Sequence, residues 1–301
     1  MDRIFEYRIT SEYSGGNIKT VLKQHFKMSS ALIKELKKYD DGIRVNGRHM
    51  RVVDTVMEGD LLTITLRDTA SENIIPNNIP LNIVYEDEDI LVIDKPPGMP
   101  VHPSMGNYEN TAANAVMYYF QSRGEDRVFR AVNRLDKDTS GLMVVAKNAY
   151  IHARLGEEIQ TGELRRRYVC IVCGDMTENG TVDAPIKRAD GSVINRIVAA
   201  DGQRAVTHYR VLKRYGKYTM LEMTLETGRT HQIRVHMSYI GHPLAGDWLY
   251  GTEDKKTVLR QMLHSCYLRF VHPITNKEME FHSKCAQDMS EFIQKILEKN
   301  A

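Results

Sequence analysis

Hydrophobic and polar residues alternate along the start of the chain with two different periods. Residues 4–9 follow the two-residue period of a strand, whereas apolar residues recur every three or four positions in residues 18–38 and predict two helices. Ser29 and Ser30 suit the N-cap of the second helix, and Asp40-Asp41-Gly42 ends it. Strands are then expected at residues 43–45 and 61–66, with a turn at Asn46-Gly47. Residues 1–70 therefore predict a small unit with a helix pair and short strands.

A second, longer unit is predicted over residues 83–301, after a polar, proline-containing linker at residues 71–82. The apolar run at residues 90–93 predicts a buried strand, and strands are expected to dominate residues 193–235. The remaining expected elements are strands at residues 142–146 and 168–172 and helices at residues 111–120, 149–159 and 290–297. This mixture of strands and helices, without an internal repeat, is typical of an α+β fold.

The composition is that of a globular protein large enough for two domains. Its 301 residues are 42% hydrophobic, and no apolar run approaches the roughly 20 residues that a membrane helix needs. No apolar stretch follows the first four residues as it would in a signal peptide, so export is not expected. Four cysteines are too few for a disulfide scaffold, which favours a reducing, cytoplasmic compartment. We expect no membrane partner and a monomeric protein.

Positive charge is concentrated near the N-terminus. The whole chain has a net charge of only +2, but residues 13–51 contain nine lysines and arginines against three acids. This region resembles the S4-like RNA-binding domain at Ser29-Ser30-Ala31-Leu32-Ile33-Lys34, at Gly42-Ile43-Arg44-Val45-Asn46-Gly47 and at Val56, Gly59 and Asp60, although many members have arginine where this chain has Ser30. The resemblance implies that Lys27, Lys34 and Arg44 bind RNA, through phosphate neutralisation. A protein-interaction module is the alternative.

One segment of the second unit carries the main functional signal. Residues 131–147 include Asn133-Arg134-Leu135-Asp136-Lys137-Asp138-Thr139-Ser140-Gly141, in which an aspartate before Thr-Ser-Gly would by itself indicate a turn or a helix cap. The whole string resembles the signature of the RluA/RluD-like RNA pseudouridine synthases, apart from Asn133, where histidine is frequent. Further matches follow in the family's order: Asp94-Lys95-Pro96-Pro97-Gly98 with Val101-His102-Pro103, Arg167-Tyr168-Val169, residues 227–236, Gly241-His242-Pro243-Leu244 and Gly246-Asp247. The resemblance covers residues 83–282 and implies a mixed, mostly antiparallel sheet for the catalytic domain.

The resemblance also implies an activity and roles for individual residues. The expected enzyme is an isomerase that converts specific uridines of structured RNA into pseudouridine, with no cofactor or metal, because no atom or electron is gained or lost. Asp136 is expected to be the catalytic carboxylate, with Arg234 binding it bidentately and opposing the rise in pKa that burial causes. The other implied roles are stacking of Tyr168 on the uracil, filling of the vacated base position by Arg134, phosphate contact or structural support by Arg229, and an apolar wall at Ile233. Asn133 is expected to change local hydrogen bonds rather than activity.

Other functions fit parts of the sequence. Cys170 and Cys173 have the spacing of half a zinc site, but Cys266 and Cys285 do not form a second close pair. A nucleoside or glycoside hydrolase needs paired carboxylates, and the two-residue spacing of Asp136 and Asp138 does not establish a facing pair. An inactive RNA-binding protein is disfavoured because the three expected catalytic residues are present. Large-subunit ribosomal RNA is the leading substrate implied by the resemblance, and transfer RNA is the alternative.

Overall fold

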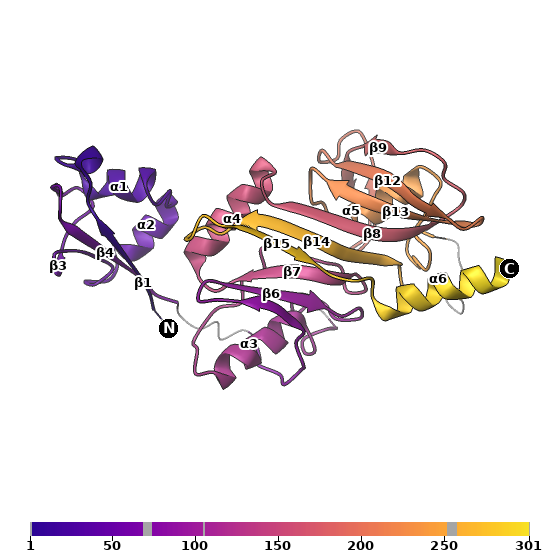
Figure 1. The fold of residues 1–301 in the computed structure, drawn as a ribbon, viewed down its shortest axis with the longest axis horizontal. Coiled ribbons are helices and arrows are strands. Elements are labelled where there is room, and N and C mark those ends of the chain that lie inside the picture. Colours follow the sequence, from indigo (N-terminus) through magenta and orange to yellow (C-terminus); the bar gives the residue numbers. More distant parts are fainter. Residues whose placement is uncertain (1, 69–73, 105, 252–257, 301) are drawn as a thin grey trace.

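The computed structural model describes residues 2–68, 74–104, 106–251 and 258–300. The N-terminal unit lies at one end of the molecule and helix α6 at the other (Figure 1). The N-terminal unit contains β1 (Arg3–Arg8), a 3-10 turn (Ser11–Tyr13), α1 (Ile18–Gln24), α2 (Ser30–Leu36), β2 (Ile43–Val45), β3 (Arg48–His49) and β4 (Leu61–Leu66). Its strands form an antiparallel sheet in the order β1-β4-β2-β3.

The local signals of the N-terminal unit are confirmed. The Ser29 hydroxyl accepts a hydrogen bond from the Leu32 amide at 3.1 Å and caps α2. Asn46 and Gly47, with φ of 49° and 79°, form the predicted two-residue turn between β2 and β3. The helix pair and its short strands therefore follow the sequence pattern; whether the unit acts as an S4-like domain stays a prediction.

The rest of the described chain is built around one large sheet. Its elements are β5 (Ile83–Glu86), β6 (Ile90–Lys95), α3 (Ala112–Ser122), β7 (Ser140–Ala146), α4 (Ala149–Thr161), β8 (Arg165–Cys173), β9 (Gly180–Asp183), β10 (Ile186–Arg188), β11 (Arg196–Val198), β12 (Val206–Arg214), β13 (Tyr218–Leu225), α5 (Gln232–Tyr239), β14 (Leu263–Val271), β15 (Glu278–His282) and α6 (Gln287–Asn300). Within the described residues, nine strands run in the order β5-β6-β7-β14-β8-β13-β12-β9, with β15 beside β14. The pairing of β7 with β14 is parallel and the other pairings are antiparallel, so the mixed, mostly antiparallel sheet of an α+β domain is confirmed.

Several strands of the sheet are buried on both faces. In β6, Ile90 and Val92 pack in the cluster that contains α4, whereas Leu91 and Ile93 pack in the cluster that contains α3. This two-sided burial explains the unbroken apolar run from which the strand was predicted. In β8, Val169 and Ile171 pack beside α6, while Tyr168 lies on the opposite face with α5. Tyr168 is thereby directed to the face of the sheet on which α5 lies.

Strand β14 was missed by the sequence pattern, although it lies at the centre of the sheet. It pairs with β8 along one edge and shares its other edge between β7 and β15. The approach of β7 is so close that a Cβ atom on Gly141 would lie 2.3 Å from the Ser265 carbonyl oxygen, and Gly141 has φ of +111°. The glycine that ends the Asp-Lys-Asp-Thr-Ser-Gly string is therefore required by the packing of β7 against β14.

The expectation that strands extend to residue 235 is wrong at its end. Residues 232–235 form the first turn of α5, which follows His231 in a left-handed conformation with φ of 58°. Ile233 and Val235 have the β-branched side chains typical of strands, but tertiary packing places both in the core as helical residues. The correction moves Arg234 from a strand to the N-terminal turn of a helix.

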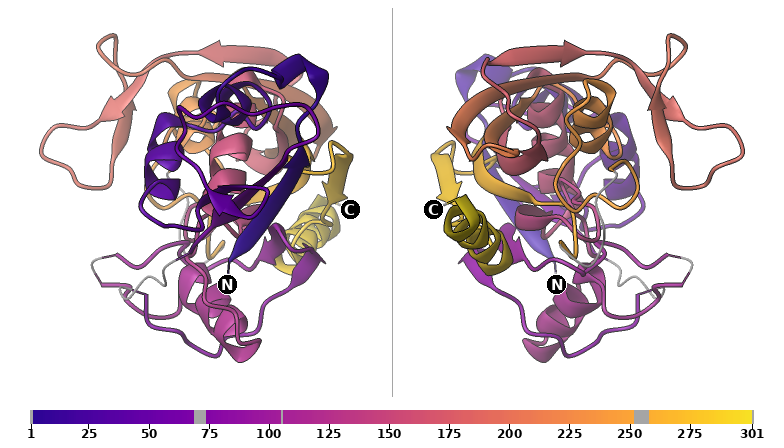
Figure 2. Two further views of the ribbon diagram at one scale, coloured as in Figure 1. Left: turned by 90° about the vertical axis from the view of Figure 1, so that its left-hand side faces the viewer. Right: turned by 90° about the vertical axis from the view of Figure 1, so that its right-hand side faces the viewer.

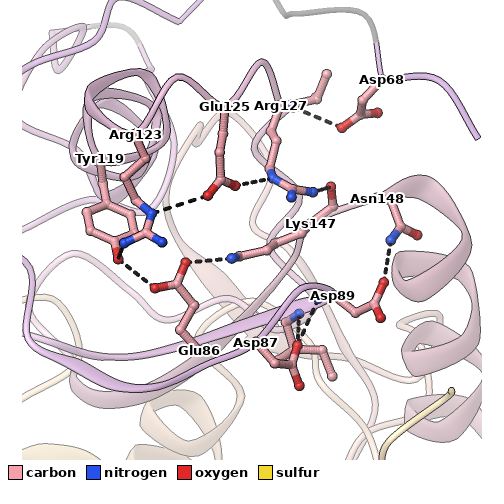
Figure 3. A network of polar contacts seen from close by, with 12 residues as sticks. Asp68, Glu86, Asp87, Asp89, Tyr119, Arg123, Glu125, Arg127, Lys147 and Asn148 are labelled. Atoms are coloured by element: carbon pink, nitrogen blue, oxygen red, sulfur yellow. Dashed lines mark hydrogen bonds and ion pairs between the residues drawn. The ribbon is translucent and has the colours of Figure 1, made fainter. Parts of the chain in front are cut away.

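The N-terminal unit packs against α4 and neighbouring loops of the second unit through apolar and ionic contacts. The rings of Phe5 and Tyr150 lie 5.3 Å apart, and the Arg3 guanidinium donates to both Asp89 carboxylate oxygens at 3.0 Å. Arg130 contacts Asp68 through two nitrogen atoms. Figure 3 shows Asp68 and Asp89 at the edge of a polar network that continues through Asn148, Lys147, Glu86, Arg127, Glu125, Arg123 and Tyr119. The contacts of Phe5, Arg3 and Asp68 with the second unit favour a fixed orientation of the N-terminal unit.

Of the predicted linker at residues 71–82, residues 71–73 lie outside the described chain. The described part contains no helix or strand, and the Asn77 amide donates to the Asn114 carbonyl oxygen of α3 at 3.1 Å. The division into domains at residues 1–70 and 83–301 stays a prediction. Among the described residues, no helix combines the length and apolar character needed to cross a bilayer.

Candidate active site

Asp136 lies in the loop that leads into β7. The Thr139 amide donates to the Asp136 carbonyl oxygen at 3.1 Å and closes a turn, while the Asp136 side chain keeps 24% of its surface exposed. Asn133, three residues earlier, is buried and accepts from the Val144 amide at 2.8 Å. The loop is thereby fastened to β7 while the carboxylate remains accessible.

Two buried cations, Lys95 and Arg260, bind carbonyl groups of this loop. The Lys95 ammonium donates to the carbonyl oxygens of Pro96, Met99 and Lys137 at 2.8, 2.8 and 3.0 Å. Arg260 donates to the Asp138 carbonyl oxygen at 3.0 Å. Consecutive carbonyl groups directly after Asp136 are thus fixed by different positive side chains, which restricts where the carboxylate can point.

The charge of Lys95 matters for this contact. Burial lowers the pKa of Lys95 to about 7, and the nearby Asp138 carboxylate opposes that shift. Three carbonyl acceptors require three N–H donors, which only the ammonium form supplies. The geometry around Lys95 therefore fits its charged form.

Arg234 joins Asp136 to a second carboxylate. Its Nη1 atom donates to Asp136 Oδ2 at 3.1 Å, while Nε and Nη2 bind the two Asp247 oxygens at 2.7 and 2.9 Å. The expected bidentate contact with Asp136 is therefore wrong, because the fork of the guanidinium is taken by Asp247. Burial disfavours the charged guanidinium, but the hydrogen bond and charge of Asp247 outweigh it and raise the pKa of Arg234. Asp136 consequently faces a permanently charged partner.

His231 and Tyr250 complete this side of the site. His231 Nε2 lies 3.8 Å from Asp136 Oδ2, and its Nδ1 is 2.8 Å from the Tyr250 hydroxyl. Burial lowers the pKa of His231, although Asp136 acts in the opposite direction. The Tyr250 ring lies under the Arg234 guanidinium, with 5.1 Å between the guanidinium carbon and the ring centroid. A neutral His231 leaves Arg234 as the charged partner of Asp136.

Tyr168 and Ile233 lie beside Asp136. Both are buried, and with Asp136, Arg234 and Leu263 they line a small cavity of about 60 Å³. Burial raises the pKa of Tyr168; Arg166 opposes this shift and Asp136 adds to it. Tyr168 is therefore a neutral phenol at neutral pH and can lie near the carboxylate without charge repulsion.

Larger cavities open on both sides of Asp136. One of about 710 Å³ is lined by Tyr168, Arg166 and the segment 225–230, and another of about 420 Å³ is lined by His102, Ile194 and Trp248. Arg134, Leu135 and Asp136 line both. Arg134 is exposed at this division, and the exposed Arg229 on the Tyr168 side donates from Nε to the Arg204 carbonyl oxygen at 3.1 Å. The site is therefore an open groove made of two cavities that meet at Asp136.

The fold thus brings together the predicted site residues of the second unit, namely Asp136, Tyr168, Arg234, Arg134, Arg229 and Ile233. Lys27, Lys34 and Arg44 are exposed on the N-terminal unit and do not line these cavities. No role was predicted for Lys95, Asp247, Tyr250 or Arg260. Lys95 and Asp247 belong to motifs that match the family, so the sequence pattern could have indicated them. Arg260 lies outside these motifs.

Cys170 and Cys173 are unsuited to binding one metal ion together. They lie three residues apart on β8, so Cys170 packs on the α3 side of the sheet and Cys173 beside the α6 cluster. Burial raises the pKa of Cys170, which disfavours the thiolate that would bind zinc. Both cysteines behave as small apolar residues here.

Comparisons with known proteins indicate the family to which this chain belongs. A sequence model of the family described as RNA pseudouridylate synthase matches residues 89–239. The uncharacterised RNA pseudouridine synthase YjbO of Bacillus subtilis (strain 168) is 43% identical over 268 residues, which cover 88% of this chain and 94% of that protein. The ribosomal large subunit pseudouridine synthase D of Yersinia pestis is 42% identical over 268 residues, covering 84% of this chain and 82% of that protein. The solved structure of human RNA pseudouridylate synthase domain containing 1 has a TM-score of 0.58 at 24% identity, covers 73% of this chain and 96% of that one, and supports the fold. The chain therefore belongs to the RluA/RluD-like family of RNA pseudouridine synthases, and the isomerase predicted from its sequence is confirmed.

Proposed function

We propose that this enzyme isomerises specific uridines of large-subunit ribosomal RNA and that Asp136 is its catalytic carboxylate. The single observation that carries the assignment of the acid is its contact with Arg234 at 3.1 Å, at the point where both cavities meet. The ribosomal substrate is supported by relatives that are about 42% identical and are named ribosomal large subunit pseudouridine synthase D.

The reaction requires a carboxylate that stays ionised while a base is bound. The bond between uracil N1 and ribose C1′ breaks, the uracil turns, and C5 bonds to C1′; C5 then loses its proton and N1 gains one. The guanidinium of Arg234, 3.1 Å from Asp136 Oδ2, places a permanent positive charge beside that carboxylate. Attack of Asp136 on C1′, addition to the uracil ring and a glycal route all begin from this ionised form.

Tyr168 and Arg134 have complementary roles in this proposal. The neutral ring of Tyr168 stacks on the uracil where the small cavity meets the larger one, since Tyr168 lines both, and Ile233 forms part of the wall. The target nucleotide must leave its RNA stack to reach this cavity, which costs a few kcal/mol in a duplex and less in a loop. Arg134, exposed beside Asp136, occupies the position that the base leaves, and Arg229 contacts a phosphate.

The N-terminal unit assists capture of the RNA. Its exposed Lys27, Lys34 and Arg44 neutralise phosphates, as the S4-like pattern of residues 1–70 implies. The enzyme acts as a cytoplasmic monomer and needs no cofactor.

Chemical mapping of pseudouridine across total RNA tests the proposal. Cells without the protein are complemented with the wild type, with Asp136→Asn or with Asp175→Asn, which removes an exposed carboxylate paired with Arg214. Wild type and Asp175→Asn restore the same ribosomal sites, whereas Asp136→Asn restores none and binds RNA within about threefold of wild type. Restored sites in transfer RNA would overturn the substrate, and full restoration by Asp136→Asn would overturn the catalytic acid.

A further inference from the structure

The cavity on the side of Asp136 away from Tyr168 has no role in the reaction described above. It has a volume of about 420 Å³, within the range of about 300–1,000 Å³ that is usual for ligand pockets. Its walls include Trp248, His102, Pro103, Ile194 and Leu249, and the cations Arg134, Lys137 and Arg234 outnumber the acids Asp136 and Asp138 there. Tyr168 does not line it. The cavity therefore combines an aromatic surface with cations, directly beside the acid.

Trp248 contributes an aromatic ring to this cavity. Its side chain is 45% exposed, and the tip of the β10–β11 arm presents further exposed apolar residues, Val193 at 81% and Ile194 at 53%. This arm stands away from the body of the domain (Figure 2). Exposed apolar groups gathered around a cavity mark a surface that binds something.

We propose that this cavity holds the nucleotide next to the target uridine in the RNA, with its base stacked on Trp248. The inference rests on the proposed function and extends it. When the target uracil lies against Tyr168, its ribose lies at Asp136, and that ribose is covalently joined to a nucleotide on each side. The second cavity starts at Asp136, so a neighbouring nucleotide enters it without leaving the strand.

The chemistry of the walls fits a nucleotide. Aromatic rings stack on every base without reading its sequence, while cations near the ribose and phosphate neutralise the backbone. Arg134 lies where the two cavities meet, so its guanidinium separates the two bases and stays near the connecting phosphate. Tyr168 and Trp248 then bind two adjacent bases on opposite sides of the acid.

The protein carries its own probe, because Trp248 is the only tryptophan in the chain. The full-length enzyme is titrated with a stem-loop of large-subunit ribosomal RNA that contains a uridine it modifies, and the tryptophan emission is recorded. Stacking quenches the emission during binding. The variants are Trp248→Ala and Trp248→Phe, with Tyr118→Ala as a control that removes a partly exposed aromatic ring from α3.

Trp248→Ala weakens RNA binding roughly 5- to 100-fold and raises KM, with kcat within about threefold of wild type. Trp248→Phe, which keeps a stacking ring, recovers most of the affinity, and Tyr118→Ala changes neither the affinity nor kcat.

An abasic site 5′ or 3′ of the target uridine weakens binding to the wild type by a similar factor at one of these positions, and has no further effect in Trp248→Ala. Unchanged emission on binding, equal weakness of the Phe and Ala variants, or additive effects of the abasic site would each overturn the inference. Turnover of the same stem-loop that depends on Asp136 keeps the proposed function separate from these outcomes.

Discussion

Arg234 binds Asp247 through two nitrogen atoms, with Nε 2.7 Å and Nη2 2.9 Å from the carboxylate oxygens. The Asp247 side chain is fully buried, and its Oδ1 atom also accepts from the amides of Leu249 and Tyr250. This pairing fixes the plane of the guanidinium and leaves Nη1 for Asp136. Asp247 therefore acts on Asp136 through Arg234, as a positioning residue.

Replacing Asp247 by asparagine tests this relationship. Asp247→Asn keeps the size of the side chain but replaces one of its two acceptor oxygens with an NH2 donor and removes its charge, so the two-point contact that orients the guanidinium is lost. We expect kcat to fall about 10- to 100-fold with RNA affinity nearly unchanged, and the free energy of unfolding to fall by about 3–5 kcal/mol. Steady-state kinetics and urea unfolding measure both, with Asp175→Asn as control. A kcat within twofold of wild type would contradict the positioning role.

A second prediction concerns Arg260, which connects α6 to the loop that contains Asp136. Arg260 binds Asp288, near the start of α6, and donates to the Asp138 carbonyl oxygen. Asp288→Asn weakens the hold on Arg260, and Arg260→Met removes the donor to the loop. We expect kcat to fall at least tenfold for Arg260→Met and less for Asp288→Asn, with KM for RNA within about threefold. Arg260→Lys does not rescue, since one ammonium cannot reach the same spread of acceptors.

The matched control for the second prediction is Lys295→Met, which removes an exposed cation from the same helix. It leaves kcat and KM unchanged. If Arg260→Met raised KM and spared kcat, the residue would act on RNA binding instead of on the loop.

The sequence predicts Asp136 as the acid of the site but does not predict the geometry around it. Asp136 and Arg234 lie in separate motifs, and their matched order was enough to pair them. Motif spacing, however, does not show that Asp247 takes the guanidinium fork, because that depends on how the loop after α5 folds back over it. Arg260 lies outside any matched motif, and its contact with the Asp138 carbonyl spans 122 positions.

The fold shows the same division between local and long-range information. Caps and turns depend on neighbouring residues, and Ser29 and Asn46-Gly47 behaved as predicted. Ile233 and Val235 have the β-branched side chains typical of strands, but residues 232–235 form a helix, because packing overrides weak local preference. Strand β14 has buried residues on both faces and therefore lacks the alternation by which a half-exposed strand is identified.

A lower pH is expected to reveal how much Asp87 contributes to the free energy of unfolding. Asp87 lies in the network of Figure 3. Burial opposes its ionisation, but hydrogen bonds from His272 and Tyr85 and from the amides of Asp89 and Ile90 outweigh burial and keep the pKa of Asp87 well below its usual range. A carboxyl group whose folded-state pKa is depressed stabilises the protein above its unfolded-state pKa of about 3.9, and this contribution is lost as the pH falls towards the folded-state value.

Asp87→Asn is therefore expected to lower the free energy of unfolding by about 1–3 kcal/mol at pH 7. The difference from wild type narrows below about pH 4, because the wild type loses the same contribution there. Urea unfolding of both proteins at pH 7 and pH 3 measures this. A difference that stayed constant across that range would mean that packing, rather than the charge of Asp87, accounts for it.

Reversal of charge on the N-terminal unit tests its role without removing it. Deletion of residues 1–70 would uncover Tyr150 and Asp89, which contact Phe5 and Arg3, so lost activity would be ambiguous.

The triple variant Lys27→Glu, Lys34→Glu and Arg44→Glu instead changes three exposed side chains. We expect RNA affinity to fall and the slope of log affinity against log salt to become shallower by about 2–3, roughly one for each phosphate contact. The control triple Lys277→Glu, Lys284→Glu and Lys295→Glu has the same change in net charge at exposed positions of the second unit. Equal losses in both triples would assign the effect to overall charge, whereas a loss confined to the first triple assigns RNA capture to the N-terminal unit.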